Sequence, residues 1–191
     1  MKRVLSLILA LMLIISCFAA CSGIPDTPHA VMTYEGRNYY YGMEIDVEKL
    51  LSDYPDTIVS GATYSISNEV SVMIREIDGK NIVVGYFVKG INAKLEGITV
   101  GDSQKKYLTN FENSSEISND GATSFVLGFY FYNGKRISHS KFYQYYTASR
   151  FEGNAAHEKF LDEVIVSTAL SNGTIITSLC YGDYRAIYDN R

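Results

Sequence analysis

The amino-acid sequence predicts an α+β fold, in which an antiparallel β-sheet is combined with two or three short helices. Three observations support this class. Apolar residues alternate with polar ones in segments that meet at Asp-Gly or Asn-Gly dipeptides, which are typical of β-hairpins. Helical spacing is confined to three short stretches. The chain also contains 16 tyrosines and 9 phenylalanines but no tryptophan, a composition that favours strands.

We expect three short helices. Asp46 is a suitable N-cap for the first, and Pro55 stops it; Ser103 caps the second, and the third spans residues 154–162. The residues that share one face of these helices are Val47, Leu50, Leu51 and Tyr54 in the first, Tyr107, Leu108 and Phe111 in the second, and Phe160 and Leu161 in the third. Because all three helices are short, each needs a sheet to pack against.

We also expect three β-hairpins, with turns at Asp78-Gly79, Asn133-Gly134 and Asn172-Gly173. The alternating apolar residues are Val70, Val72 and Ile74, then Ile82, Val84, Tyr86 and Val88, then Phe125, Leu127, Phe129 and Phe131, then Val164, Val166, Thr168 and Leu170, and finally Ile175, Thr177, Leu179 and Tyr181. Hairpins join antiparallel strands, so the pattern excludes a parallel sheet of βαβ units.

Composition excludes several classes of function. The 191 residues include 17 Lys+Arg and 21 Asp+Glu, for a formal net charge of −4, and 47% of them are hydrophobic. The hydrophobic fraction is too high for a disordered chain, and the basic residues are too few to neutralise many phosphates of a nucleic acid. Three cysteines are too few for a disulfide framework or a cysteine-based zinc site. We find no metal-binding histidine motif and no phosphate-binding glycine loop, and we expect no metal and no cofactor.

The N-terminus has the pattern of a targeting segment. Lys2 and Arg3 precede an apolar run from Val4 to Ser16, and small residues follow it. A bilayer-spanning helix needs about 20 apolar residues, and this run is shorter. The pattern therefore predicts a cleaved secretory signal.

The cysteines in this segment refine that prediction. Phe18-Ala19-Ala20-Cys21 resembles the lipobox of a bacterial lipoprotein signal, although Phe stands where Leu is usual, and Ile14-Ile15-Ser16-Cys17 also fits the pattern. We favour Cys21, because polar residues follow it and the apolar segment then has its full length. The resemblance implies that residues 1–20 are removed, that Cys21 is lipidated, and that the protein is extracytoplasmic, attached to the cell membrane or to an outer membrane if the host has one.

The rest of the chain divides into a tether and one folded region. Residues 21–30 contain Pro25 and Pro28 and show no periodicity, so they form the tether, and residues 31–191 form the α+β domain. Removal of residues 1–20 takes away Lys2 and Arg3 but no acidic residue, so the net charge becomes −6. Anionic lipid headgroups repel such a domain, and its membrane contact is expected to come from the acyl chains.

A weak internal echo suggests two fused small repeats. Residues 42–54 resemble residues 101–111, and each segment is followed by Ile-Ser-Asn and an acidic residue, and later by a hairpin turn that ends in Gly-Lys. The order of glycine, capped helix and antiparallel strands resembles the repeat of β-lactamase-inhibitor-like and outer-membrane-assembly lipoprotein domains.

Signals for catalysis are weak. His139 and His157 are the histidines of the folded region, and neither belongs to a motif with metal-ligand spacing. Cys180 alternates with apolar residues, as a buried small hydrophobe does, although pairing with one of these histidines as a nucleophile stays open. No glycine-flanked serine motif of a hydrolase is present.

The aromatic residues carry the strongest binding signal. We expect Phe142 to Tyr146 to form a strand, with Tyr143 and Tyr145 on one face and Arg150 following. Exposed tyrosine and arginine are enriched at recognition surfaces. Tyr143, Tyr145 and Arg150 are therefore the predicted ligand-binding residues, unless both faces of the segment are covered.

The sequence thus predicts a membrane-anchored extracytoplasmic lipoprotein with a noncatalytic binding or interaction domain. Its expected partners are the membrane, reached through the N-terminal lipid, and an envelope protein or glycan. Nucleic acid is excluded as a partner. Two alternatives stay open: a cell-envelope hydrolase whose dispersed site uses His139, His157 or a pair of carboxylates, and a structural or assembly lipoprotein.

Overall fold

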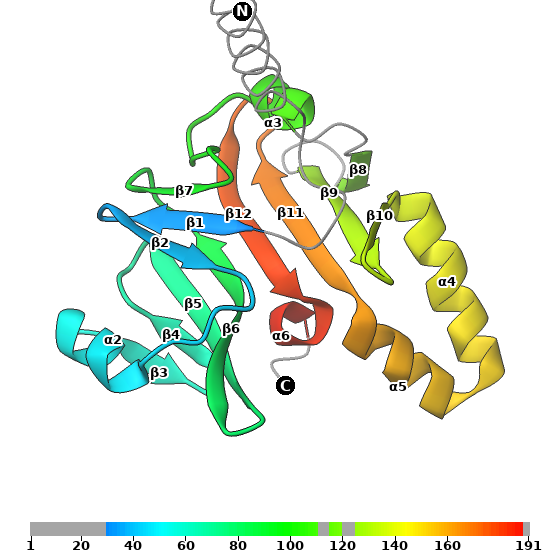
Figure 1. Cartoon of the computed structure of the whole chain (residues 1–191). Helices are drawn as coiled ribbons and strands as arrows, with labels where there is room; N and C mark the ends of the chain where they lie inside the picture. Colours follow the sequence, from blue (N-terminus) through cyan, green and yellow to red (C-terminus); the bar gives the residue numbers. More distant parts are fainter. Residues whose placement is uncertain (1–29, 111–114, 120–124, 189–191) are drawn as a thin grey trace, which may run out of the picture.

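The computed structural model describes residues 30–110, 115–119 and 125–188. The predicted signal peptide and nearly all of the tether lie outside these ranges, and Cys17 and Cys21 with them. The described residues form twelve strands and five helices, which confirms the α+β class (Figure 1). The strands are β1 (Val31–Tyr34), β2 (Arg37–Tyr40), β3 (Ile58–Ser60), β4 (Thr63–Ser65), β5 (Val70–Ile77), β6 (Lys80–Val88), β7 (Ala93–Leu95), β8 (Ser115–Asn119), β9 (Phe125–Tyr132), β10 (Lys135–Ile137), β11 (Ile165–Ser171) and β12 (Ile176–Asp183). The helices are α2 (Val47–Asp53), α3 (Gln104–Asn110), α4 (His139–Glu152), α5 (Asn154–Glu163) and α6 (Tyr184–Tyr188).

The larger sheet has nine antiparallel strands. Eight of them follow the order β10-β9-β11-β12-β6-β5-β4-β3, and β8 pairs with the first part of β9. β10 pairs with the last three residues of β9, so β8 and β10 lie one after the other along the same edge of that strand. The sheet therefore combines strands from both halves of the chain.

The three predicted hairpins are confirmed. β5 joins β6 through Asp78-Gly79, and β9 joins β10 through Asn133-Gly134. All four of these turn residues have positive φ angles, which tight hairpin turns require. In the β11–β12 turn the side-chain oxygen of Asn172 accepts hydrogen bonds from the backbone N–H groups of Thr174 and Ile175.

The three predicted helices are also present. Asp46 caps α2 by accepting a hydrogen bond from the backbone N–H of Lys49 at 2.9 Å, and Ser103 caps α3 by accepting one from Lys106 at 3.1 Å. Leu51 and Leu108 were expected to face the core together with their neighbours, but they lie on the exposed side of these helices. Helices α4 and α6 are additional to the prediction.

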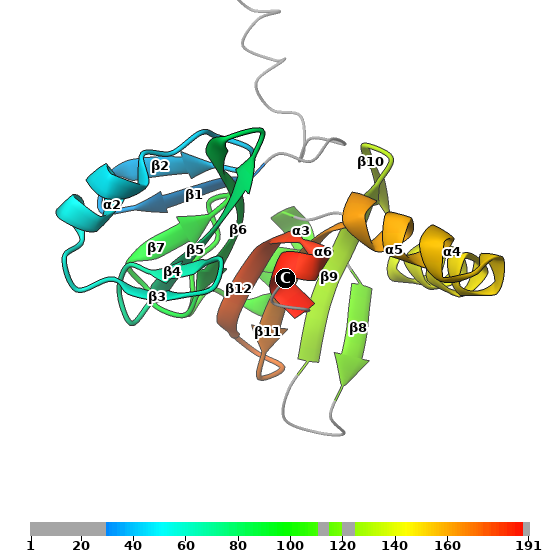
Figure 2. The same cartoon turned by 90° about the horizontal axis from the view of Figure 1, so that it is seen from below.

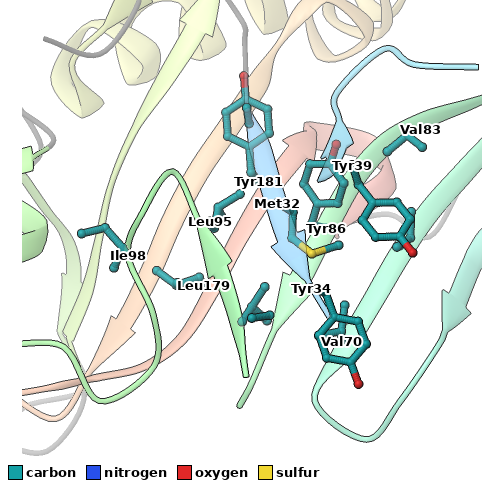
Figure 3. Packing of buried hydrophobic residues seen from close by; sticks show 14 of the residues in the cluster. Met32, Tyr34, Tyr39, Val70, Val83, Tyr86, Leu95, Ile98, Leu179 and Tyr181 are labelled. Carbon is teal, nitrogen blue, oxygen red and sulfur yellow. The ribbon is translucent and has the colours of Figure 1, made fainter. Parts of the chain in front are cut away.

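A small sheet covers one face of the large one. Its strands have the order β2-β1-β7, and the core lies between the two sheets (Figures 1 and 2). Figure 3 shows residues of the small sheet together with residues of the large one: Met32, Tyr34, Tyr39 and Leu95 beside Val70, Val83, Tyr86, Leu179 and Tyr181. The predicted inward-facing residues Leu127, Phe129 and Phe131 of β9 belong to this core.

Helices α4, α5 and α6 lie on the opposite face. Tyr130 and Val166 of the sheet pack with Phe142 of α4 and with Phe160 and Leu161 of α5. A second cluster joins Met73 and Val84 to Ala186 of α6. The large sheet is therefore covered on both faces at β9, which explains why this strand carries aromatic residues on both of its sides.

The predicted alternation along β6 is wrong at one point. Val84 is an extra residue in the pairing with β5, since Met73 pairs with Gly85 and Ile74 with Val83. Because of this bulge Ile82 and Val84 pack on the helix-covered face, whereas Tyr86 and Val88 face the small sheet.

The prediction of a strand at Phe142–Tyr146 is also wrong, because these residues belong to the fourteen-residue helix α4. Ser138 caps this helix by accepting a hydrogen bond from the backbone N–H of Lys141. Packing outweighs the intrinsic strand propensity of aromatic residues here. Phe142 and Tyr146 lie one helical turn apart, and both contact Phe160 of α5.

The internal echo stays a prediction. Helices α2 and α3 each contain seven residues, and hairpins β5–β6 and β9–β10 follow them. The continuations differ, because β6 leads to β7 in the small sheet, whereas β10 leads to the helical pair α4–α5.

The core contains a tyrosine whose hydroxyl should contribute nothing to stability. Tyr86 is fully buried, and its hydroxyl group has no hydrogen-bond partner among the described residues. We expect Tyr86→Phe to leave the free energy of unfolding unchanged or to raise it by about 1 kcal/mol. Tyr39→Phe is the control, because the Tyr39 hydroxyl donates to that of Tyr54 at 3.2 Å; it should lose about 1 kcal/mol. Urea unfolding measures both, and an equal loss in the two variants contradicts the expectation.

Candidate binding surface on helix α4

Helix α4 is held rigidly against the sheet by its inner side. The ring of Phe142 stacks on that of Tyr130 in β9, with centroids 3.9 Å apart and nearly parallel planes. Phe142 also contacts Phe160 of α5 and Tyr184 of α6. Gly153, with a φ angle of 107°, ends α4 and lets α5 begin at the next residue. The two helices thus form a hairpin between β10 and β11 (Figure 2).

The outer side of α4 exposes aromatic rings to solvent. Tyr143 is 62% exposed and Phe151 is 87% exposed. Tyr143, Tyr146, Thr147, Arg150 and Phe151 line a shallow hollow of about 360 Å³. These positions are three, four, seven and eight residues after the first, so they form one stripe along the helix.

The charge of this stripe is positive. Arg150 makes no ion pair with the described residues, and its guanidinium carbon lies 5.9 Å from the centroid of the Tyr146 ring. No carboxylate lines the hollow. The stripe therefore offers apolar area and one free cation in a chain whose net charge is −4.

The structure brings two of the three predicted binding residues together. Tyr143 and Arg150 line the same hollow, seven residues apart on one helix face. Tyr145 points to another side, where it contacts Tyr132 with ring centroids 5.0 Å apart and lines a separate hollow of about 340 Å³ with Glu152 and Lys159. The expected pairing of Tyr143 with Tyr145 followed from the strand prediction and is wrong.

Phe151 lines the same hollow, and sequence reasoning missed it. Helical spacing from Tyr143 places Thr147, Arg150 and Phe151 on one side, but this signal is visible only once the segment is read as a helix. The Ser138 N-cap and Gly153 at the other end were the available signs of such a helix.

The histidines do not form a catalytic pair. His139 lies at the first position of α4, where Nδ1 is 3.4 Å from the Tyr130 hydroxyl, and His157 lies on α5, where Nδ1 is 2.9 Å from Oγ of Ser149. The Ser149 hydroxyl also lies 2.9 Å from the carbonyl oxygen of Tyr146, so its single proton serves one of these two contacts. Both histidine contacts join α4 to a neighbouring element, β9 or α5.

Cys180 has the environment predicted for a small buried hydrophobe. It is a buried, free cysteine, and burial raises the pKa of its thiol, while Thr168 on the neighbouring strand opposes that shift. A raised pKa disfavours the thiolate that a nucleophile needs.

A polar cluster that the sequence did not indicate joins the two sheets. The Tyr41 hydroxyl donates to Oδ1 of Asp183 at 2.5 Å, and Nη1 of Arg75 lies 3.6 Å from Oδ2. Burial raises the pKa of Asp183 above its usual range, and the hydrogen bond from Tyr41 and the charge of Arg75 oppose that shift.

This shift has a consequence for stability. A carboxyl group that binds its proton more tightly in the folded state contributes stability that falls as the pH rises from its ordinary pKa of 3.8 through the folded value. We expect Asp183→Asn, which keeps an acceptor for Tyr41, to become more stable relative to the wild type as the pH rises from 4 toward 7. Urea unfolding across this pH range measures the difference, and a relative loss of stability with rising pH contradicts the sign.

Metal-ligand clusters and membrane-spanning helices are absent from the described part of the chain. Residues 30–110, 115–119 and 125–188 contain no group of three His, Cys, Asp or Glu side chains that could hold a metal ion. Within the same ranges, none of the helices has the length and hydropathy needed to cross a bilayer.

Comparisons with known proteins place the chain in no family. No protein-family model matches it. No curated protein and no solved structure matches it either.

Proposed function

We propose that this protein is a membrane-anchored extracytoplasmic lipoprotein that binds a partner protein of the cell envelope through the outer stripe of α4, without catalysis. The observation that carries the proposal is the exposure of Tyr143 and Phe151 in one hollow with Arg150, which forms no ion pair with the described residues. Aromatic residues and arginine dominate the energetics of protein interfaces, and contiguous exposed apolar side chains mark interaction sites.

The contacts that fix α4 to the rest of the domain support this proposal. The inner side of α4 is fixed by Phe142 and Ser149, so the stripe is presented on a rigid element rather than on a loop. Rigid presentation lowers the entropic cost of binding, because few side chains must be ordered when the partner arrives.

The chemistry of the stripe selects the kind of partner. Apolar rings with one cation and no carboxylate fit a segment that carries an acidic side chain beside apolar ones.

Arg150→Glu should weaken capture of the partner by full-length, detergent-solubilised protein at least 10-fold, because it places like charges opposite each other. Glu152→Arg is the control, since Glu152 lines the other hollow and its change should leave capture unaltered. Equal effects of the two variants overturn the choice of surface.

Anchoring rests on the sequence at Cys21. The nine residues between Cys21 and the start of the domain span at most about 30 Å. The lipid therefore keeps α4 near the membrane, where the local concentration of other membrane-attached proteins is high.

Growth with labelled palmitate tests the assignment of Cys21 as the lipidated residue. The wild type and Cys17→Ser should incorporate the label, and Cys21→Ser should not. Labelling that is lost only in Cys17→Ser contradicts the choice of cysteine, and an unlabelled wild type contradicts the lipoprotein proposal.

A further inference from the structure

The β3–β4 hairpin lies at the end of the large sheet opposite to α4 (Figure 1), and a second concave surface lies beside it on the helix-covered face. It is a hollow of about 510 Å³ beside the β3–β4 hairpin, with walls from β5 and β6. Its volume lies within the range of small-molecule pockets in proteins. The neighbouring part of the same face is covered by α6, which contacts Met73 and Val84.

The floor of the hollow is a row of aligned residues. Ser65 of β4 pairs with Ser71 of β5, and Ser71 pairs with Phe87 of β6, so these three side chains stand side by side across the sheet. Both serines and Phe87 are partly exposed and line the hollow. The register thus places two hydroxyl groups next to an aromatic ring.

The two serines retain unused hydrogen-bonding capacity. Their Oγ atoms are 3.0 Å apart and form one hydrogen bond with each other. Two hydroxyl groups offer two donors and four acceptor lone pairs, so this single bond leaves one donor and three lone pairs. Ser65 and Ser71 make no other side-chain hydrogen bond within the described ranges. The floor can therefore both donate to and accept from one ligand.

Two charged side chains at the rim add a strong donor and a strong acceptor. Lys89 and Asp56 are exposed, and neither forms an ion pair or a side-chain hydrogen bond with any other described residue. Glu69 also lines the hollow, but its carboxylate already accepts from the side-chain amide of Asn92 at 2.9 Å. Both hydrogen bonds from Asn92 end on Oε2 of Glu69, so its Oε1 also stays available to a ligand, together with Lys89 and Asp56.

The same hollow contains apolar surface. Ile58 of β3 is 71% exposed at the rim, and Phe87 forms part of the floor. The ligand must therefore combine several hydroxyl groups, which both donate and accept, with patches of C–H surface. A sugar ring has this combination.

We propose that this hollow is a sugar-binding site, in which Ser65, Ser71, Asp56 and Lys89 hydrogen-bond the hydroxyl groups and Phe87 and Ile58 contact the C–H face of the ring. The site is separate from the stripe on α4 and adds a second binding activity to the protein. Because it is open to solvent and uses few residues, we expect an affinity in the millimolar range, about 1 mM.

Saturation-transfer NMR on the full-length, detergent-solubilised protein tests this site, with glucose, galactose and N-acetylglucosamine as probes. At least one of the sugars should show saturable binding that weakens 10-fold or more in the double variant Ser65→Ala/Ser71→Ala and in Lys89→Ala. Both serines are partly exposed, so the double variant should fold, and thermal unfolding checks this.

The control is Tyr143→Ala on α4, which should leave sugar binding unchanged. The absence of saturable binding for all three sugars overturns the proposal. Binding that is unaffected by the serine and lysine variants, or that is lost in Tyr143→Ala, overturns the location of the site.

Discussion

Gly182→Ala should destabilise the domain by about 3 kcal/mol or more, because β6 and β12 approach each other too closely there for a side chain. A β-carbon on Gly182 would meet the carbonyl oxygen of Val84 and would lie 2.5 Å from the α-carbon of Gly85. These are backbone atoms in the centre of the large sheet, and they cannot move without breaking the pairing between the two strands. Thermal unfolding should show a melting temperature lower by about 10 °C.

Gly36→Ala separates the effect of this clash from ordinary backbone strain. Gly36 has a φ angle of 76° in the turn between β1 and β2, and a β-carbon there meets nothing within 4 Å. Its replacement should cost only about 1 kcal/mol. Equal losses of stability in the two variants would show that the close approach of β6 and β12 at Gly182 tolerates a side chain.

Tyr143→Ala/Phe151→Ala should weaken binding of the partner about 100-fold while leaving the fold intact. The two exposed rings supply apolar area to the stripe, and aromatic anchors of this kind each contribute roughly 2 kcal/mol or more to an interface. Because the rings are exposed, their removal should change the free energy of unfolding by less than about 1 kcal/mol. Co-purification of the partner with full-length protein, titrated against protein concentration, measures the loss.

The matched control is Tyr40→Ala. Tyr40 lies on β2 in the small sheet and is 44% exposed, so its removal also takes an exposed aromatic ring from the surface. Binding should be unchanged in this variant. A partner that binds both variants as well as the wild type contradicts the role of the stripe.

The parts of the fold that could be predicted are those encoded locally. The turns at Asp78-Gly79 and Asn133-Gly134 need positive φ angles that these residues adopt easily, and the flanking alternation then defines the hairpins. The caps at Asp46 and Ser103 likewise depend on residues only three positions apart. Such signals survive in any context, and they were sufficient for the α+β class.

The parts that failed depend on contacts between distant segments. The bulge at Val84 accompanies the close approach of Gly85 to Gly182, and neither glycine indicates by itself which strand it will meet. Helix α4 carries aromatic residues on its buried and exposed sides alike, so no apolar stripe distinguishes it from a strand in the sequence. Its partners Tyr130 and Phe160 decide the outcome.

The candidate site follows the same rule. Tyr143 and Arg150 were identified because exposed aromatic and guanidinium groups are typical of interfaces, whatever structure carries them. Phe151 required the helical period, and the row of Ser65, Ser71 and Phe87 required the register of three strands. The sequence shows which residues are of a type that is common at binding sites, whereas only the fold shows which of them lie together.

Site-specific photocrosslinking in intact source cells tests the role of α4 most directly. A benzophenone amino acid is introduced at position 143, 151 or 40 of the full-length protein, and the adducts are compared after irradiation. Positions 143 and 151 should give an adduct with the same envelope protein, and position 40 should not give this adduct. The absence of an adduct at 143 and 151, or the same adduct from all three positions, would contradict recognition through the outer stripe of α4.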